Sequence, residues 1–221
     1  MASAPSHPAP TAPRAAPAAP VAATPVAYAR VIAAAFRQRG LSPDGALRLA
    51  QITPAQLQRP QGRITALQME WLSGAAMQAL DDEALGAFGR RLPWGSYGML
   101  ARASLTAPDL GLALRRWCRH HALLTRDLVL RLAVTGETAA IVVEESPAHL
   151  AHPPEAREFS LVHILRNIHG LACWYVDSRI PLQGAAFPFE APPHADAFAH
   201  MFPGPLAFGA AQASIRFDAR Y

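Results

Sequence analysis

Residues 127–144 read Asp-Leu-Val-Leu-Arg-Leu-Ala-Val-Thr-Gly-Glu-Thr-Ala-Ala-Ile-Val-Val-Glu, and this stretch decides the fold. From residue 128 to residue 134 every second residue is leucine or valine, which is the period of a half-buried β-strand. Thr135-Gly136-Glu137 supplies a turn, and residues 139–144 predict the returning strand of a hairpin. Because the apolar residues before this hairpin recur at helical spacing, the chain is expected to combine helices with an antiparallel sheet.

The region before residue 91 predicts a run of amphipathic helices joined by short loops. Three of them start with a serine or threonine cap followed by a proline at the first helical position. The helices are expected to begin at Thr24-Pro25, Ser42-Pro43 and Thr53-Pro54, and then to cover residues 65–80 and 82–90. These helices would form a separate helical region ahead of the sheet.

The middle of the chain predicts one further helix, which follows a segment interrupted by Gly95 and Gly98. Thr106 is expected to cap it, with Asp109 at the third helical position of a capping box. The buried stripe of this helix would consist of Leu110, Leu114, Trp117 and His121.

The last third of the chain predicts helices and strands in alternation. We expect a long helix over 155–175, a strand over 180–189, a short helix over 194–201, and strands over 206–208 and 214–218. The fold class is therefore α+β, with an N-terminal helical region followed by helices packed on a small antiparallel sheet.

Composition excludes several classes of protein. Apolar residues make up 51% of the 221 residues, which is enough for a sizeable core. No apolar run approaches the ~18 residues of a membrane helix, so we expect no membrane span. The first 25 residues hold seven prolines and ten alanines, so residues 1–24 predict a disordered leader and residues 25–221 the folded domain. Nothing in this leader resembles a secretory signal, and the two cysteines have no metal or redox spacing, so we expect a cytoplasmic protein.

The charge pattern at first suggests a nucleic-acid binder. All 20 basic residues are arginine and the isoelectric point is about 9.7, yet the net charge is only +4. The arginines form no clustered stripe of the kind that phosphate binding requires. Residues 42–58 contain two short helices, but the second carries no basic side chain that could read a major groove. We expect this chain to make no DNA contact of its own.

Enzyme and metal signatures do not occur in the sequence. There is no phosphate-binding glycine loop, no nucleophile elbow and no metalloprotease motif, so we expect no enzyme, no metal and no cofactor. One alternative stays open, a haem sensor with His120, His121 or His163 as the axial ligand.

The aromatic residues in the middle of the chain are the most informative for binding. Such rings could line a cavity between the helices and the sheet, or fill the same gap as ordinary core residues. Histidines and an arginine near them would orient a ligand, and Arg102 could pair with a carboxylate. The candidate pocket consists of Trp94, Tyr97, Arg102, Trp117, His120, His121, His163 and Trp174.

Three stretches resemble the N-terminal effector-sensing domain of AraC/XylS-type transcription regulators, in the arabinose-binding-like branch. Residues 95–121 are similar to the family's glycine-containing helix, loop and following helix with a histidine near its end. Residues 174–182, Trp-Tyr-Val-Asp-Ser-Arg-Ile-Pro-Leu, resemble its Trp-Leu-x-x-x-x-Ile-Pro-Leu junction. Residues 187–209 resemble its proline-containing strand, short helix and Phe-x-x-Pro-Val-x-Phe-Gly tail. Pro108, Asp109 and Tyr175 depart from the family's more common residues at their positions.

The resemblance implies a domain that binds a small metabolite, such as an amino acid or an apolar acid. It also implies a C-terminal helix-turn-helix module, and the linker to that module would start where this chain stops at Tyr221. DNA would then be bound only through that module, and the effector domain could form a homodimer. We favour a fragment of a longer regulator over a stand-alone sensor. The alternative from another class is a dimerisation or interaction module that takes no ligand.

Overall fold

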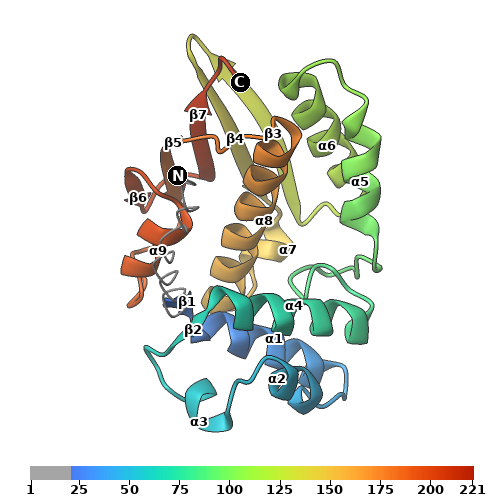
Figure 1. Cartoon of the computed structure of the whole chain (residues 1–221), viewed down its shortest axis with the longest axis vertical. Coiled ribbons are helices and arrows are strands. Elements are labelled where there is room, and N and C mark those ends of the chain that lie inside the picture. The colour runs from blue at the N-terminus through green and yellow to red at the C-terminus, as the bar shows by residue number, and fades with distance from the viewer. Residues whose placement is uncertain (1–20) are drawn as a thin grey trace, which may run out of the picture.

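The computed structural model describes residues 21–221, and it has the predicted α+β class. Four helices of the N-terminal half gather at one end of the molecule (Figure 1): α1 (Val26–Gln38), α2 (Asp44–Leu49), α3 (Pro54–Leu57) and α4 (Ala66–Leu80). The long helix α8 (Pro154–Tyr175) runs through the middle and contacts α1, α6 (Leu110–Leu124) and the sheet. Its buried side carries large apolar residues such as Phe159, Leu165 and Ile168.

A five-stranded sheet forms the other end of the molecule, beside α5 (Ser96–Leu105) and α6 (Figure 1). Its strands lie in the order β3 (Leu128–Thr135), β4 (Thr138–Glu145), β7 (Ala213–Asp218), β5 (Leu182–Phe187) and β6 (Leu206–Phe208). The predicted hairpin is confirmed, because β3 pairs with β4 in an unbroken antiparallel register from Leu128↔Glu145 to Thr135↔Thr138. The sheet is mixed rather than antiparallel throughout, since β6 pairs parallel to β5.

The start of the described chain differs from the prediction. Residues Ala22–Pro25 form β1, which pairs antiparallel with β2 (Arg63–Thr65). Thr24 therefore lies in a strand and does not cap α1, whose first N–H, that of Val26, bonds to the carbonyl of Gly62 at 2.9 Å. The predicted leader, residues 1–24, falls outside the described residues up to residue 20.

The cap predicted at Thr53 is confirmed, because Thr53 forms a full capping box with Gln56, and Thr65 forms another with Gln68 at the start of α4. The cap predicted at Ser42 is wrong: Pro43 stands at the N-cap of α2 without a side-chain cap bond, and the Ser42 hydroxyl accepts the N–H of Asp44 at 3.2 Å. Thr106 does not cap α6. Asp109 does, by accepting the N–H of Leu112 at 2.7 Å, because its side chain is one residue from the first helical turn.

Several other elements match their predicted positions closely. The long helix over 155–175 and the short one over 194–201 are α8 and α9 (Asp196–Met201), and the three C-terminal strands are β5, β6 and β7. The short helix α7 (Pro147–Leu150) was not predicted. Gly98 does not interrupt the chain but lies inside α5, whereas Gly95 precedes that helix with a φ of +96°.

The helix predicted over 82–90 does not form, and the reason is the side chain of Asp82. This carboxylate is 0% exposed and accepts the backbone N–H groups of Ala84, Gly86 and Leu92 at 2.9–3.0 Å. Because these N–H groups bond to the Asp82 side chain, they cannot form the backbone hydrogen bonds of a helix. Leu85 and Gly86 both have a positive φ, which also breaks the helical path of the chain. Arg39 at the end of α1 pairs with the same carboxylate at 2.6 Å. The segment 81–95 is therefore a compact loop fixed to α1.

A second buried carboxylate connects three elements around α8. Glu158 accepts the hydroxyl of Tyr28 on α1 at 2.9 Å and lies 2.6 Å from the ring Nε2 of His194, which precedes α9. Burial and the nearby Glu158 raise the pKa of Tyr28 well above its usual range, so the hydroxyl stays protonated as a donor. The rings of Tyr28 and His194 also pack edge-on with centroids 6.0 Å apart, so these contacts join α1, α8 and the start of α9 at one point. No helix among residues 21–221 is both long and apolar enough to cross a bilayer.

Asp82→Ala should destabilise the domain strongly. The substitution leaves three backbone N–H groups and the Arg39 guanidinium without their acceptor, and such losses cost about 3 kcal/mol or more in total. Urea unfolding measures this as a drop in the free energy of unfolding. Glu70→Ala, which removes an exposed carboxylate on α4, should change it by less than about 0.5 kcal/mol. Equal effects of the two substitutions would contradict the role given to Asp82.

Candidate functional site

Four aromatic side chains meet where the loop 81–95 packs on α5 and α6. The ring of Tyr97 stacks on Trp117 with centroids 6.0 Å apart, and Trp117 stacks on His121 at 5.2 Å. Phe88, from the loop, meets His121 edge-on at 6.1 Å. Trp117 and His121 are almost fully buried, as their place on the predicted stripe requires. We call Phe88, Tyr97, Trp117 and His121 the aromatic cluster.

The loop positions Tyr97 through a buried carboxylate. Glu83 is 7% exposed and accepts the backbone N–H groups of Gly95 at 2.8 Å and of Tyr97 at 2.6 Å. These donors lie at the start of α5, where a negative charge also stabilises the helix dipole. Burial, together with the carboxylates of Glu83 and Asp82, raises the pKa of Tyr97, so its hydroxyl stays neutral.

His121 is a buried polar group whose ring nitrogens make no hydrogen bond of good geometry among the residues that the structure describes. The residue is 0% exposed, and burial lowers the pKa of His121 to about 4, against 6.5 for the free side chain. The nearby backbone of Leu128 opposes this shift of the pKa only in part. At neutral pH the ring is therefore uncharged and packs as an aromatic residue.

A small cavity adjoins the aromatic cluster and brings His163 close to it. Its volume is about 10 Å³, which is room for about one water molecule. The lining residues are Ala84, Ala87, Phe88, Tyr97, Phe159, Ser160, His163 and Ile164. His163 stacks on Phe159 at 5.4 Å, and burial, with the nearby charge of Arg166, lowers the pKa of His163 to about 4.

Four of the eight candidate residues thus gather in one region, and four do not join them. Tyr97, Trp117, His121 and His163 surround the cluster and its small cavity. Trp94 and Trp174 are 53% and 63% exposed, and Arg102 is exposed on α5. His120 is half-buried and follows Arg119 on α6, outside the stacked rings. Sequence spacing alone could not separate these two groups.

The haem alternative does not fit this region. His121 and His163 are buried among aromatic rings, and the cavity beside Tyr97 and His163 holds about one water molecule. A haem needs an apolar cleft many times larger than that. Within residues 21–221 there is likewise no group of three or more metal-ligating side chains.

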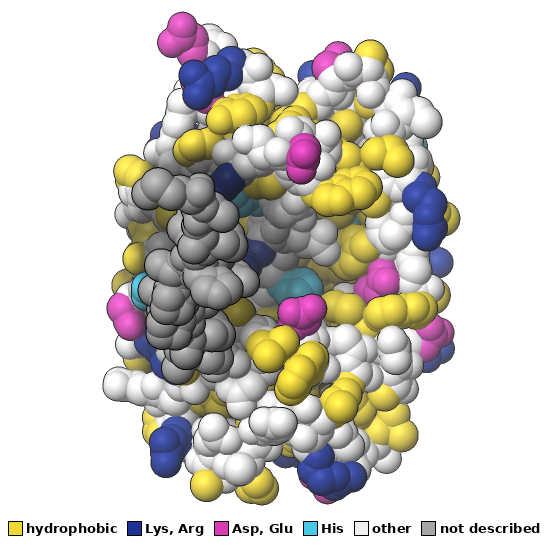
Figure 2. Space-filling view, viewed as in Figure 1, with side chains coloured by type: hydrophobic (Ala, Val, Ile, Leu, Met, Phe, Trp, Pro, Cys, Tyr) yellow, Lys and Arg dark blue, Asp and Glu magenta, His cyan; other side chains and the backbone are white. Residues whose placement is uncertain are grey.

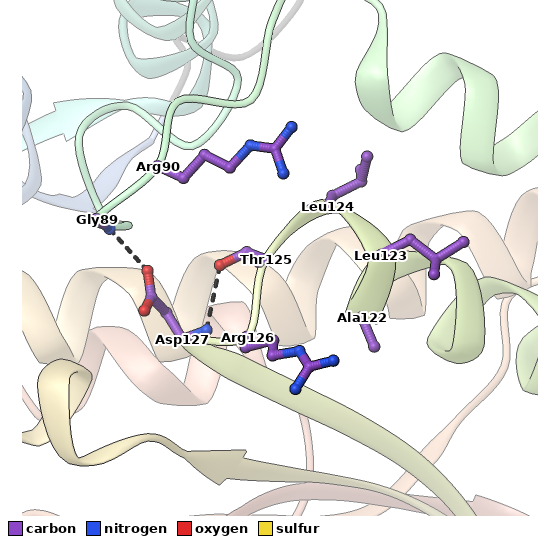
Figure 3. A pocket seen from close by; sticks show the side chains of 8 residues that line it. All are labelled: Gly89, Arg90, Ala122, Leu123, Leu124, Thr125, Arg126 and Asp127. Atoms are coloured by element: carbon purple, nitrogen blue, oxygen red, sulfur yellow. Dashed lines mark hydrogen bonds between the residues drawn. The ribbon is translucent and has the colours of Figure 1, made fainter.

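A second, larger pocket opens at the junction of α6 and β3 (Figure 3). Its volume is about 480 Å³, within the range of small-molecule sites. It is lined by Gly89, Arg90, Ala122, Leu123, Leu124, Thr125, Arg126 and Asp127, and we call it the junction pocket. None of the eight candidate residues lines it. The sequence signal that could have found it is the polar turn 125–127, where the helical period changes to the strand period.

Hydrogen bonds fix the rim of the junction pocket. The carboxylate of Asp127 accepts the N–H of Gly89 at 2.7 Å, and the hydroxyl of Thr125 accepts the N–H of Asp127 at 3.1 Å. Both bonds are drawn in Figure 3. The first joins the loop 81–95 to the start of β3. The pocket therefore lies between an element fixed to the helical end and an element of the sheet.

Glu145, His149 and Ser160 are connected in the order acid–histidine–serine, as in a hydrolase triad, but they lie inside the protein. His149 is 2.9 Å from Glu145 through Nδ1 and 2.7 Å from Ser160 through Nε2. Ser160 is only 2% exposed, and its hydroxyl donates to the carbonyl of Arg157 at 2.9 Å. The guanidinium of Arg157 pairs with Glu145 through two hydrogen bonds. Burial raises the pKa of Glu145, but hydrogen bonds from Arg157 and His149 outweigh it and lower the pKa overall. The cluster connects β4, α7 and α8 and offers no access to a substrate.

Among the described residues on the face drawn in Figure 2, no continuous basic surface is visible. Figure 2 shows arginines scattered among apolar and acidic side chains there, without a continuous basic stripe. The same face is hollowed in the middle (Figure 2).

Acid should destabilise the protein through His121. The folded pKa of about 4 lies below the unfolded value of 6.5, so the unfolded state binds more protons between these values. The stabilisation is complete above pH 6.5 and is lost as the pH falls toward 4, by about 2–3 kcal/mol. His121→Phe should remove this part of the pH dependence, whatever its effect at neutral pH, whereas the exposed control His200→Phe should not. The measurement is the free energy of unfolding of wild type and both variants between pH 4 and pH 6.5. If this free energy depends on pH in the same way for wild type and His121→Phe, the role given to His121 is wrong.

Comparisons with known proteins identify a family and two similar proteins. Residues 40–221 match the family described as the arabinose-binding domain of AraC transcription regulators, N-terminal. The ornithine utilization regulator of Pseudomonas aeruginosa is 26% identical over 180 residues, which are 80% of this chain and 52% of that protein. The crystal structure of the transcriptional regulator CdpR from Pseudomonas aeruginosa matches with a TM-score of 0.43 and 18% identity, over 84% of this chain and 55% of that one.

The chain thus spans about half the length of these two relatives. The family match covers the whole five-stranded sheet and every element from α2 onward. The chain therefore belongs to the family of N-terminal arabinose-binding domains of AraC-type transcription regulators.

Proposed function

We propose that residues 25–221 are an effector-sensing domain that binds a small metabolite and controls a helix-turn-helix module outside this chain. The observation that carries the proposal is the junction pocket, a volume of about 480 Å³ in a domain of a regulator family. We place the protein in the bacterial cytoplasm, where a regulator meets its DNA, and we assign it no enzymatic role.

A ligand in the junction pocket would act on two parts of the domain at once. Gly89 and Arg90 belong to the loop 81–95, which the Asp82–Arg39 pair fixes to α1. Residues 122–127 belong to α6 and β3. A ligand that contacts both sides stabilises the arrangement in which they are close, and it shifts the equilibrium by its difference in affinity for the two states.

The name of one relative suggests where a search for the effector should start. That relative is a regulator of ornithine utilization, so ornithine and other amino acids belong in a panel of metabolites, together with small organic acids. The family's name is not by itself a reason to expect arabinose.

A matching metabolite should raise the melting temperature of this chain. At a concentration a hundred times its Kd it adds about 2.7 kcal/mol, which for this size corresponds to about 5 °C or more. Ala122→Trp, which fills the junction pocket, should weaken this response at least tenfold. Ala103→Trp, an exposed substitution on α5, should leave it unchanged. A panel that shifts nothing, with Trp117 fluorescence also constant, would reject the sensing role.

The ligand-free dimerisation module is a second candidate, because several large apolar side chains are exposed. Met99 and Leu105 on α5 are 53% and 54% exposed, and Leu123 at the end of α6 is 74% exposed. Trp117 is 1% exposed and so cannot make such a contact. Sedimentation of Met99→Ser and Leu105→Ser distinguishes the candidates, since loss of a dimer with intact ligand response would show that the two roles are separate.

A further inference from the structure

We infer that the junction pocket binds an organic carboxylate whose anionic end lies against Arg90 and Arg126 and whose apolar part packs on Leu123 and Leu124. This inference rests on the proposed sensing function and specifies its ligand class. It is argued from the charges, the apolar wall and the fixed rim of the pocket.

The two arginines supply positive charge that the protein itself does not neutralise. Neither Arg90 nor Arg126 has an ion-pair partner within the part of the chain that the structure describes. The nearest acid that lines the pocket, Asp127, already accepts the N–H of Gly89. In Figure 3 the two guanidinium groups lie on either side of Thr125. Two like charges at one pocket repel each other, and a bound anion removes that cost while it gains charge-assisted hydrogen bonds.

The leucines define the other half of the ligand. Leu123 is 74% exposed and Leu124 is partly buried, and Figure 3 shows both on the side toward which the guanidinium groups extend. Removing an exposed leucine from water is favourable. An apolar group that covers it stabilises the complex by about 25 cal/mol per Å² of apolar area buried. A purely polar anion such as phosphate would leave this wall unused. The pocket therefore favours a carboxylate that carries a hydrocarbon group.

The rim connects the pocket to the aromatic cluster. The N–H of Thr125 bonds to the carbonyl of His121 at 3.2 Å, and the ring of His121 stacks on Trp117. A ligand that fixes the 122–127 turn should therefore alter the surroundings of Trp117. Tryptophan fluorescence can report binding even though no tryptophan lines the junction pocket.

Hexanoate, hexanol and hexylamine are suitable probes, because they share a hydrocarbon chain and differ in charge. Saturation-transfer NMR and tryptophan fluorescence on the whole chain give a Kd for each. We expect hexanoate to bind at least tenfold more tightly than hexanol, and hexylamine to bind least. Arg90→Gln and Arg126→Gln should each weaken hexanoate about tenfold or more and leave hexanol nearly unchanged.

Arg115→Gln is the matched control, because it removes one exposed arginine from α6, the helix that ends at the pocket, without touching the pocket lining. Its affinity for hexanoate should equal that of the wild type. If hexanoate binds no better than hexanol, or binds Arg126→Gln as it binds the wild type, the carboxylate site is wrong. If a metabolite of the panel still raises the melting temperature in that case, the sensing function is supported and its binding site lies elsewhere in the domain. If hexanoate depends on both arginines while no metabolite of the panel has any effect, the anion site stands and the sensing function fails.

Discussion

The buried carboxylate of Asp82 is the interaction on which the rest of the arrangement depends. It takes three backbone donors from its own loop and one guanidinium from the end of α1, so the charge is fully compensated although water does not reach it. A buried charge is tolerated only under such conditions. The result is a loop that is hydrogen-bonded to its own carboxylate and paired with the end of α1, and that also contacts α5 and the start of β3.

This one loop contributes to both features that a sensor would use. Its residue Phe88 completes the aromatic cluster, and Glu83 fixes the start of α5 so that Tyr97 stacks on Trp117. Gly89 and Arg90, in the second half of the loop, form one wall of the junction pocket. A small molecule that binds there would therefore act on an element already connected to α1, without any need for a longer path through the core.

The two parts of the site differ in how open they are. The aromatic cluster is closed, and the cavity beside it has room for about one water molecule. The junction pocket is open, and its Arg90 and Arg126 have no ion-pair partner among the residues that the structure describes. Trp117, a candidate ligand contact by its position in the sequence, is 1% exposed and packs between Tyr97 and His121.

Local patterns in the sequence determined the elements whose hydrogen bonds are local. The alternation of residues 128–134 gave the hairpin its strands and register, and Thr53 and Thr65 gave two helices their starts. The family resemblance, carried by glycine, proline and aromatic positions, identified the domain. Tertiary structure decided the loop 81–95, because the acceptor that prevents a helix there also requires Arg39 from 43 residues away. Tertiary structure also decided that β6 pairs parallel to β5, and it formed the junction pocket. Such features depend on residues that are distant in the chain and meet only after the core has packed, so no local period could reveal them.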